Sequence, residues 1–158
     1  MSSGILLISI RPEHAAKIFD GSKKVELRRV RPKVTSGDVV FVYVSAPVKA
    51  LVGAFYVEKV VEASPRMLWG QVKDIAGINR ARFDDYYNGA INAFGIFVQE
   101  TRQLPKPVGL ESLKDIVSSF RPPQSYRYIT PTEAAAIDST SHQIMKKDLL
   151  QTMPASVR

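Results

Sequence analysis

The sequence predicts an α+β protein built on a β-barrel. Four apolar segments, each suited to a strand, are separated by turn signals and single helical patterns; they cover residues 5–10, 39–44, 50–57 and 93–98. A doubly wound parallel sheet needs a helix after nearly every strand, so this order of elements favours a barrel. A chain of 158 residues is long enough to bury a full core within one domain.

The first predicted elements are a buried strand and an amphipathic helix. Residues 5–10 form a nearly unbroken apolar run, typical of a strand that is covered on both faces. Pro12 suits the first turn of the helix, apolar residues then recur at helical spacing, and Gly21 ends it. His14 lies one position off the apolar face, so we expect it at the partly exposed surface.

A short strand with one charged face follows directly. Its side chains alternate between an apolar face and a charged face that carries Lys24, Glu26 and Arg28. Lys23 and Arg29 flank these positions, so several cations surround one carboxylate. Such an arrangement suits an anionic or hydrogen-bonding ligand. The alternative is a charged face that is simply solvated.

The middle of the chain predicts a hairpin and two helices. A turn leads into the strand 39–44, and a further strand runs from 50 to about 62. Gly53 within that strand predicts a bulge or a tight barrel corner. Capping residues followed by helical spacing then predict helices over 65–76 and 79–88.

The last third predicts one strand and two short helices. After the strand 93–98, the proline-containing stretch 99–107 is expected to be a connection. Helices are predicted over 110–117 and, from a capping pattern, over 130–137. Residues 138–158 carry few apolar anchors, which predicts a weakly structured C-terminal tail with a weak helix near 143–151.

Composition narrows the possible functions. The chain carries 22 Lys and Arg against 15 Asp and Glu, a net charge of +7 that favours polyanionic partners. It has no cysteine, and His14 and His142 are its only histidines, so we expect neither a metal site nor a cofactor. No window approaches the roughly 20 apolar residues that a membrane span needs, and we expect a cytoplasmic protein without a membrane partner.

The charged strand also carries a resemblance. The pattern Gly21-x-Lys23-x-x-Glu26-x-Arg28 resembles the signature of the ASCH domain family, and the order of elements from about residue 5 to residue 105 is similar to that of the family. The resemblance implies a PUA-like β-barrel of five to six strands with flanking helices, and a link to RNA.

The resemblance also suggests the domain limits. Residues 122–128 resemble the ending of the longer prokaryotic members of the family. We therefore expect an ASCH or PUA-like domain over residues 1–137, followed by the tail 138–158.

The first functional hypothesis is a binding module for RNA or for a modified nucleoside or nucleotide. Cations would hold phosphates, Glu26 could accept hydrogen bonds from the exocyclic amine of a base, and aromatic rings could stack on bases. The expected ligand-binding residues are Lys23, Lys24, Glu26, Arg28, Arg29, Tyr43 and Tyr126.

The second hypothesis is a hydrolase. Some small ASCH proteins are amidohydrolases acting on a modified cytidine, and others are described as ribonucleases. The resemblance implies a basic role for Lys23, but Glu26 stands where the amidohydrolases have a threonine nucleophile. In a ribonuclease, Glu26 would act as general base, with Lys23 and Arg28 stabilising the transition state. A third possibility is a protein-interaction scaffold.

Overall fold

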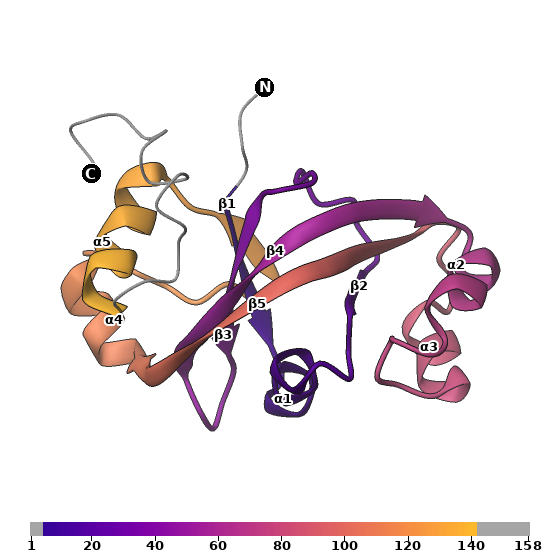
Figure 1. Cartoon of the computed structure of the whole chain (residues 1–158), viewed down its shortest axis with the longest axis horizontal. Helices are drawn as coiled ribbons and strands as arrows, with labels where there is room; N and C mark the ends of the chain where they lie inside the picture. Colours follow the sequence, from indigo (N-terminus) through magenta and orange to yellow (C-terminus); the bar gives the residue numbers. More distant parts are fainter. Residues whose placement is uncertain (1–4, 142–158) are drawn as a thin grey trace.

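The computed structural model describes residues 5–141 and shows one curled sheet with helices at both of its ends and beneath it (Figure 1). The α+β prediction is confirmed. The strands are β1 (Ile5–Ile10), β2 (Val25–Arg28), β3 (Val39–Val44), β4 (Ala50–Ala63), β5 (Ala93–Gly109) and β6 (Tyr126–Tyr128). The helices are α1 (Pro12–Asp20), α2 (Pro65–Val72), α3 (Arg80–Tyr86), α4 (Leu110–Ile116) and α5 (Pro131–Ser141).

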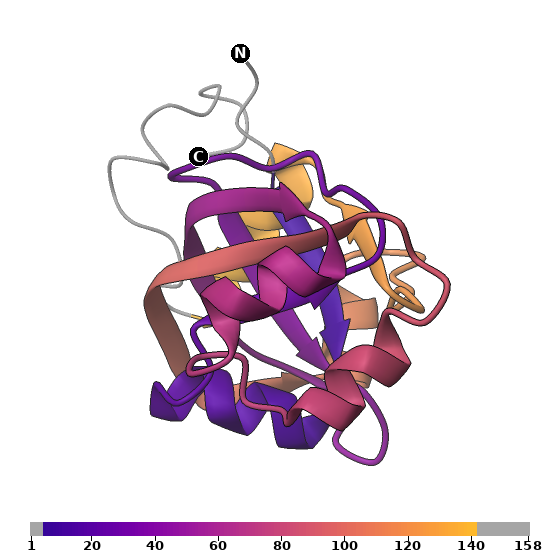
Figure 2. The same cartoon turned by 90° about the vertical axis from the view of Figure 1, so that its right-hand side faces the viewer.

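The six strands lie in the order β2-β5-β4-β3-β1-β6. Of these neighbours only β1 and β3 run parallel, because α1 and β2 form the crossover between them. The sheet curls into a half-barrel (Figure 2), with α2 and α3 at one end and α4 and α5 at the other. No helix among residues 5–141 is long and apolar enough to cross a membrane.

Side chains connect the two edge strands, β2 and β6. Arg28, the last residue of β2, donates a hydrogen bond from Nη1 to Ser125 Oγ, just before β6, over 2.8 Å. The backbone N–H of Lys33 donates to the hydroxyl of Tyr128 on β6. Within the described residues, the edges of the curled sheet are thus brought together at β2 and β6.

The strand β5 is longer than the sequence predicts. It continues through Pro105 and Pro107 to Gly109, although the sequence indicates a connection after residue 98. The register with β4 explains this difference. Leu51 pairs with Val108 and Gly53 with Gln103, so both prolines fall in a bulged stretch where β5 has extra residues. The same irregularity confirms the bulge predicted at Gly53.

Helix limits differ from prediction where turns intervene. The helix predicted over 65–76 ends at Val72, because Ile75 N–H bonds to Val72 O in a tight turn. The helix predicted over 79–88 spans only Arg80–Tyr86, with the Asn79 side chain as its N-cap.

Near the C-terminus, β6 was not predicted, and α5 continues past residue 137 to Ser141. A three-residue strand has too little pattern to reveal itself in the sequence. The predicted helix near 143–151 lies outside the described residues.

Three apolar clusters position the pocket described below. One lies between the sheet and α4 with α5, another between the sheet and α1, and the third joins β2 and β5 to α2 and α3. Val25 and Leu27 belong to the third cluster and are 0% and 6% exposed. Because their side chains anchor β2 against α2 and α3, the alternate residues of β2 are held facing α1.

Candidate functional site: a charged pocket between α1, β2 and α3

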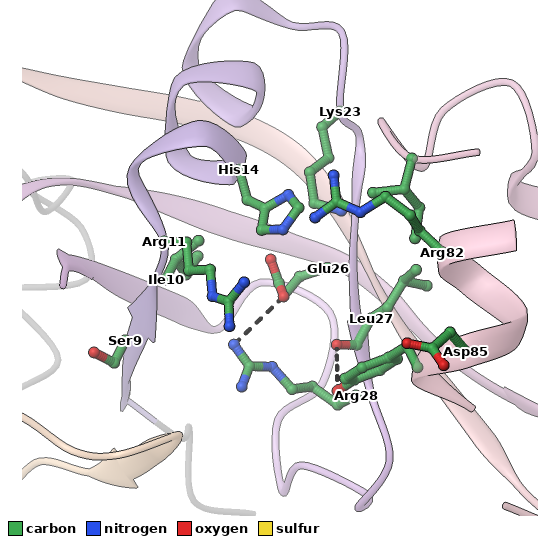
Figure 3. A pocket seen from close by; sticks show the side chains of 12 residues that line it. Ser9, Ile10, Arg11, His14, Lys23, Glu26, Leu27, Arg28, Arg82 and Asp85 are labelled. Carbon is green, nitrogen blue, oxygen red and sulfur yellow. Dashed lines mark hydrogen bonds and ion pairs between the residues drawn. The ribbon is translucent and has the colours of Figure 1, made fainter. Parts of the chain in front are cut away.

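A cavity of about 410 Å³ opens between the end of β1, the start of α1, β2 and α3 (Figure 3). Its volume falls in the range of pockets for small molecules and cofactors. The lining residues are Ser9, Ile10, Arg11, His14, Lys23, Glu26, Leu27, Arg28, Ile78, Arg82, Asp85 and Tyr86. Four cationic side chains therefore meet two carboxylates in one pocket.

Glu26 lies on β2 at the centre of this pocket. It is only 8% exposed, and its backbone is paired with Ile96 of β5. Its Oε1 lies 3.4 Å from Arg28 Nη2, whereas Oε2 is buried without a hydrogen-bond partner. A buried carboxylate is costly unless it is paired, so Arg28 supports the charge of Glu26 while one oxygen remains unsatisfied.

Lys23 enters the pocket from the turn before β2. It is 3% exposed, and its Nζ donates to the carbonyl of Ala76 over 2.7 Å. Burial lowers the pKa of its ammonium group, and the nearby Glu26 partly opposes that shift. Gly77, at φ 71°, passes so close that a Cβ there would lie 3.1 Å from Lys23 Cβ. The turn around Gly77 is thus shaped to cover this lysine.

His14 reaches the pocket from the first turn of α1. Its side chain is 21% exposed, so the partly exposed position predicted for it is confirmed, yet it lines the charged pocket. Burial lowers its pKa, Lys23 adds to that effect, and Glu26 and Glu13 oppose it. The imidazole is therefore held neutral near pH 7, and its Nδ1 is buried without a partner.

The side of the pocket opposite α1 is formed by α3. Arg82 projects over the pocket opposite α1 (Figure 3), where its Nη2 lies 3.5 Å from Glu13 Oε1. The hydroxyl of Tyr86 donates a hydrogen bond to the carbonyl of Leu27 over 3.2 Å. Arg29 then donates to the carbonyl of Tyr86, so the charged strand and the end of α3 hold each other in place.

The structure brings together three of the seven predicted ligand-binding residues, Lys23, Glu26 and Arg28. Lys23 belongs to this group although it is not on the charged face of the strand. Two other predicted residues, Lys24 and Arg29, are exposed and do not line the pocket. The functional roles of all of them remain predictions.

The two aromatic candidates also lie outside the pocket lining. Tyr43 is 2% exposed, and its ring packs 6.4 Å from that of Phe120 in the core. Tyr126 lies edge-on to Tyr128, with 5.9 Å between the ring centroids.

Six polar or aromatic lining residues were not predicted as site residues: Ser9, Arg11, His14, Arg82, Asp85 and Tyr86. In the sequence, Arg82, Asp85 and Tyr86 are typical of an exposed helix face. Nothing in their local spacing shows that α3 packs opposite α1. His14 alone had a detectable signal, since it stands off the apolar face of its helix. Among the described residues, no group of three or more His, Cys, Asp or Glu side chains is placed to hold a metal ion.

The curled mixed sheet with a charged pocket at β2 defines a protein of the PUA-like class. A family model described as the ASCH domain matches residues 8–106. The chain belongs to the ASCH domain family, and the resemblance seen in its sequence is confirmed.

A curated relative from Zymomonas mobilis, named an ASCH domain-containing ribonuclease, is 30% identical over 87% of this chain and 93% of its own length. The crystal structure of ASCH from Zymomonas mobilis superposes with a TM-score of 0.83 at 29% identity, covering 90% of this chain and 99% of that one. The N-terminal domain of McrB from Staphylothermus marinus shares the fold at a TM-score of 0.57 and 16% identity, over 88% and 95% of the two chains.

Proposed function

We propose that this protein binds RNA in the charged pocket. The observation that carries the proposal is the meeting of Arg11, Lys23, Arg28 and Arg82 around the buried carboxylate of Glu26. Cations gathered around a pocket suit the phosphates of a nucleic acid, and a carboxylate suits the hydrogen-bond donors of a base. The name of the Zymomonas relative supports an RNA ligand.

A second depression extends the basic surface beyond the pocket. It shares Ile78 and Arg82 with the pocket and adds the lysines Lys17 and Lys73. A strand of RNA entering the pocket would therefore find further cations for its neighbouring phosphates. Single-stranded nucleic acids are commonly held by such basic tracks.

The test is a titration of a short single-stranded RNA at two salt concentrations. We expect Arg82→Gln to weaken binding by about tenfold, the loss typical of a charged hydrogen bond. Lys106→Gln removes one charge from an exposed position on β5 outside both depressions and should leave the affinity unchanged apart from a small general effect. Equal losses in the two variants would place binding elsewhere, and affinity independent of salt would favour the protein-interaction scaffold.

A second candidate is cleavage of the bound RNA. It is favoured by the relative that is named a ribonuclease, and by the presence of His14, Lys23 and Glu26 in the same pocket as three arginines. Proton-transferring groups beside phosphate-binding cations are the components that phosphodiester cleavage requires. End-labelled RNA incubated with the protein tests this candidate. Binding without any shortening of the RNA would leave the protein as a binding module.

A further inference from the structure

We propose that His14 is the proton acceptor in RNA cleavage, and that Glu26 is its positioning residue. The proposal rests on the cleavage candidate above and assigns roles within that pocket. It differs from the sequence-based hypothesis, in which Glu26 itself is the base.

Unsatisfied polar atoms in the floor of the pocket carry the proposal. His14 Nδ1 and Glu26 Oε2 are both buried, and neither has a hydrogen-bond partner in the structure. Arg28 Nε, from the same lining, is a third buried atom without a partner. Buried polar groups nearly always have partners, so His14 Nδ1 and Glu26 Oε2 are exceptional. They are chemically complementary, since an imidazole N–H donates and a carboxylate oxygen accepts. The two side chains also interact electrostatically, and both lie in the middle of the pocket (Figure 3).

A hydrogen bond between them would define the roles of both groups. A carboxylate that accepts from one ring nitrogen fixes the tautomer and orientation of an imidazole and leaves the other nitrogen free to take a proton. Glu26 can serve in this way because Arg28 contacts its Oε1, while its Oε2 has no hydrogen-bond partner and can accept from the imidazole. We expect this hydrogen bond to form when RNA binds, since catalytic hydrogen bonds often tighten only in the complex.

The charged and titratable groups around His14 come from three directions. On its own helix, Glu13 Oε1 lies 3.7 Å from His14 Nε2, and Arg11 precedes the helix. From the β2 side come Lys23, Glu26 and Arg28, and from α3 come Arg82, Asp85 and Tyr86. Cations and burial together favour the neutral ring, which is the form that accepts a proton, and the carboxylates favour the imidazolium that forms.

The proposed step balances without a further reactant. Neutral His14 takes the proton of the ribose 2′-hydroxyl while the 2′-oxygen forms a bond to the adjacent phosphorus. The bond from phosphorus to the 5′-oxygen breaks, and that oxygen takes a proton from the Lys23 ammonium group. The products are a 2′,3′-cyclic phosphate and a 5′-hydroxyl. Arg11, Arg28 and Arg82 stabilise the charge on the phosphorane.

The first test measures the pKa of His14 directly by NMR. The chain has two histidines, so the resonances of His14 can be assigned with a His142→Gln variant and followed through a pH titration. We expect Glu26→Gln to move the pKa of His14 to lower pH, because the carboxylate favours the protonated ring. We also expect it to change the tautomer shown by the nitrogen shifts. An unchanged pKa and tautomer would overturn the positioning role of Glu26.

The second test measures cleavage by wild type, His14→Gln and His142→Gln, with RNA affinity followed in parallel. We expect His14→Gln to slow cleavage by about 100-fold or more while RNA still binds, since a general base contributes about that much. The acid limb of the pH–rate profile should move to lower pH in Glu26→Gln. His142→Gln should cleave like wild type, and RNA with 2′-deoxyribose at the cleavage position should remain intact.

The outcomes distinguish the assignment of His14 and Glu26 from the RNA-cleavage candidate on which it rests. Cleavage by wild type and His14→Gln at equal rates would overturn the assignment of His14 and leave the cleavage candidate standing. Binding of RNA by wild type without cleavage would overturn both. A product with a 3′-hydroxyl in place of the cyclic phosphate would overturn the proposed step.

Discussion

Arg28 has two oxygen partners that come from different parts of the chain, one on β2 and one just before β6. Its guanidinium contacts Glu26 Oε1 at 3.4 Å within the pocket and Ser125 Oγ at 2.8 Å before β6. Arg28→Ala should lower the free energy of unfolding by about 1–3 kcal/mol, because Glu26 would remain buried without its counter-charge. It should also weaken RNA binding. Chemical denaturation and RNA titration measure the two effects.

The pair of Arg31 and Glu62 is the matched control for that variant. It is shorter, at 2.6 Å, but its side chains are 63% and 42% exposed. Solvent screens such a pair, so Arg31→Ala should cost only about 0.5 kcal/mol. A similar cost for both arginines would show that burial of Glu26 is unimportant.

Lys23 gives a prediction about pH. Its pKa is lowered in the folded protein, so between that lowered value and the usual pKa near 10.5 the unfolded chain binds more protons than the folded one. The free energy of unfolding of wild type should therefore rise with pH through this window relative to that of Lys23→Met. Urea unfolding of both proteins at a series of pH values measures the difference. A constant difference would mean that Lys23 keeps its ordinary pKa in the fold.

At the scale of elements, Gly53 sets how closely α1 approaches the sheet. A Cβ at this position would lie 2.3 Å from the carbonyl oxygen of Arg102 and 2.8 Å from Cζ of Phe19. Gly53→Ala should therefore destabilise the protein by about 1–3 kcal/mol through overpacking. Gly70→Ala is the control, because a Cβ there meets nothing within 4 Å and Gly70 lies within α2. That change should stabilise by up to about 1 kcal/mol in thermal unfolding.

Most elements could be predicted from local patterns. The strand at Ile5–Ile10 and the helix at Pro12–Asp20 have the predicted limits, since continuous apolar runs, an N-terminal proline and a C-terminal glycine are local signals. The extension of β5 through Pro105 could not be predicted, because a bulge in its pairing with β4 accommodates the proline.

The candidate site, too, could be predicted only where local sequence patterns indicate its residues. The alternation of charged and apolar residues along β2 indicates Glu26 and Arg28, so their common pocket could be predicted. Arg82 and Tyr86 reach the same pocket only because α3 packs across from α1. No spacing within α3 carries that information, which arises from the tertiary contacts of Phe83 and Tyr87 with the third cluster.

The limit of the whole domain can be tested by truncation. The predicted boundary after residue 137 would cut α5, which continues to Ser141 and includes Asp138, 7% exposed. Ending the chain after Ser141 should leave the melting temperature unchanged, since residues beyond it carry few apolar anchors. Ending it after Ile137 should lower the melting temperature by about 2–4 °C, as expected for a loss near 1 kcal/mol. Equal melting temperatures would support the predicted boundary at 137.

The pairing of β2 has a consequence for the order in which the molecule can assemble. Residues 25–28 lie early in the chain, yet their ladder partners are Phe94–Phe97 of β5, and Lys24 N–H bonds to the carbonyl of Ile75. A nascent chain that ends before β5 has no partner for β2 and no carbonyl of Ala76 for Lys23. The pocket therefore closes only after most of the sheet has been synthesised, and an N-terminal fragment would carry the signature residues without the site they form.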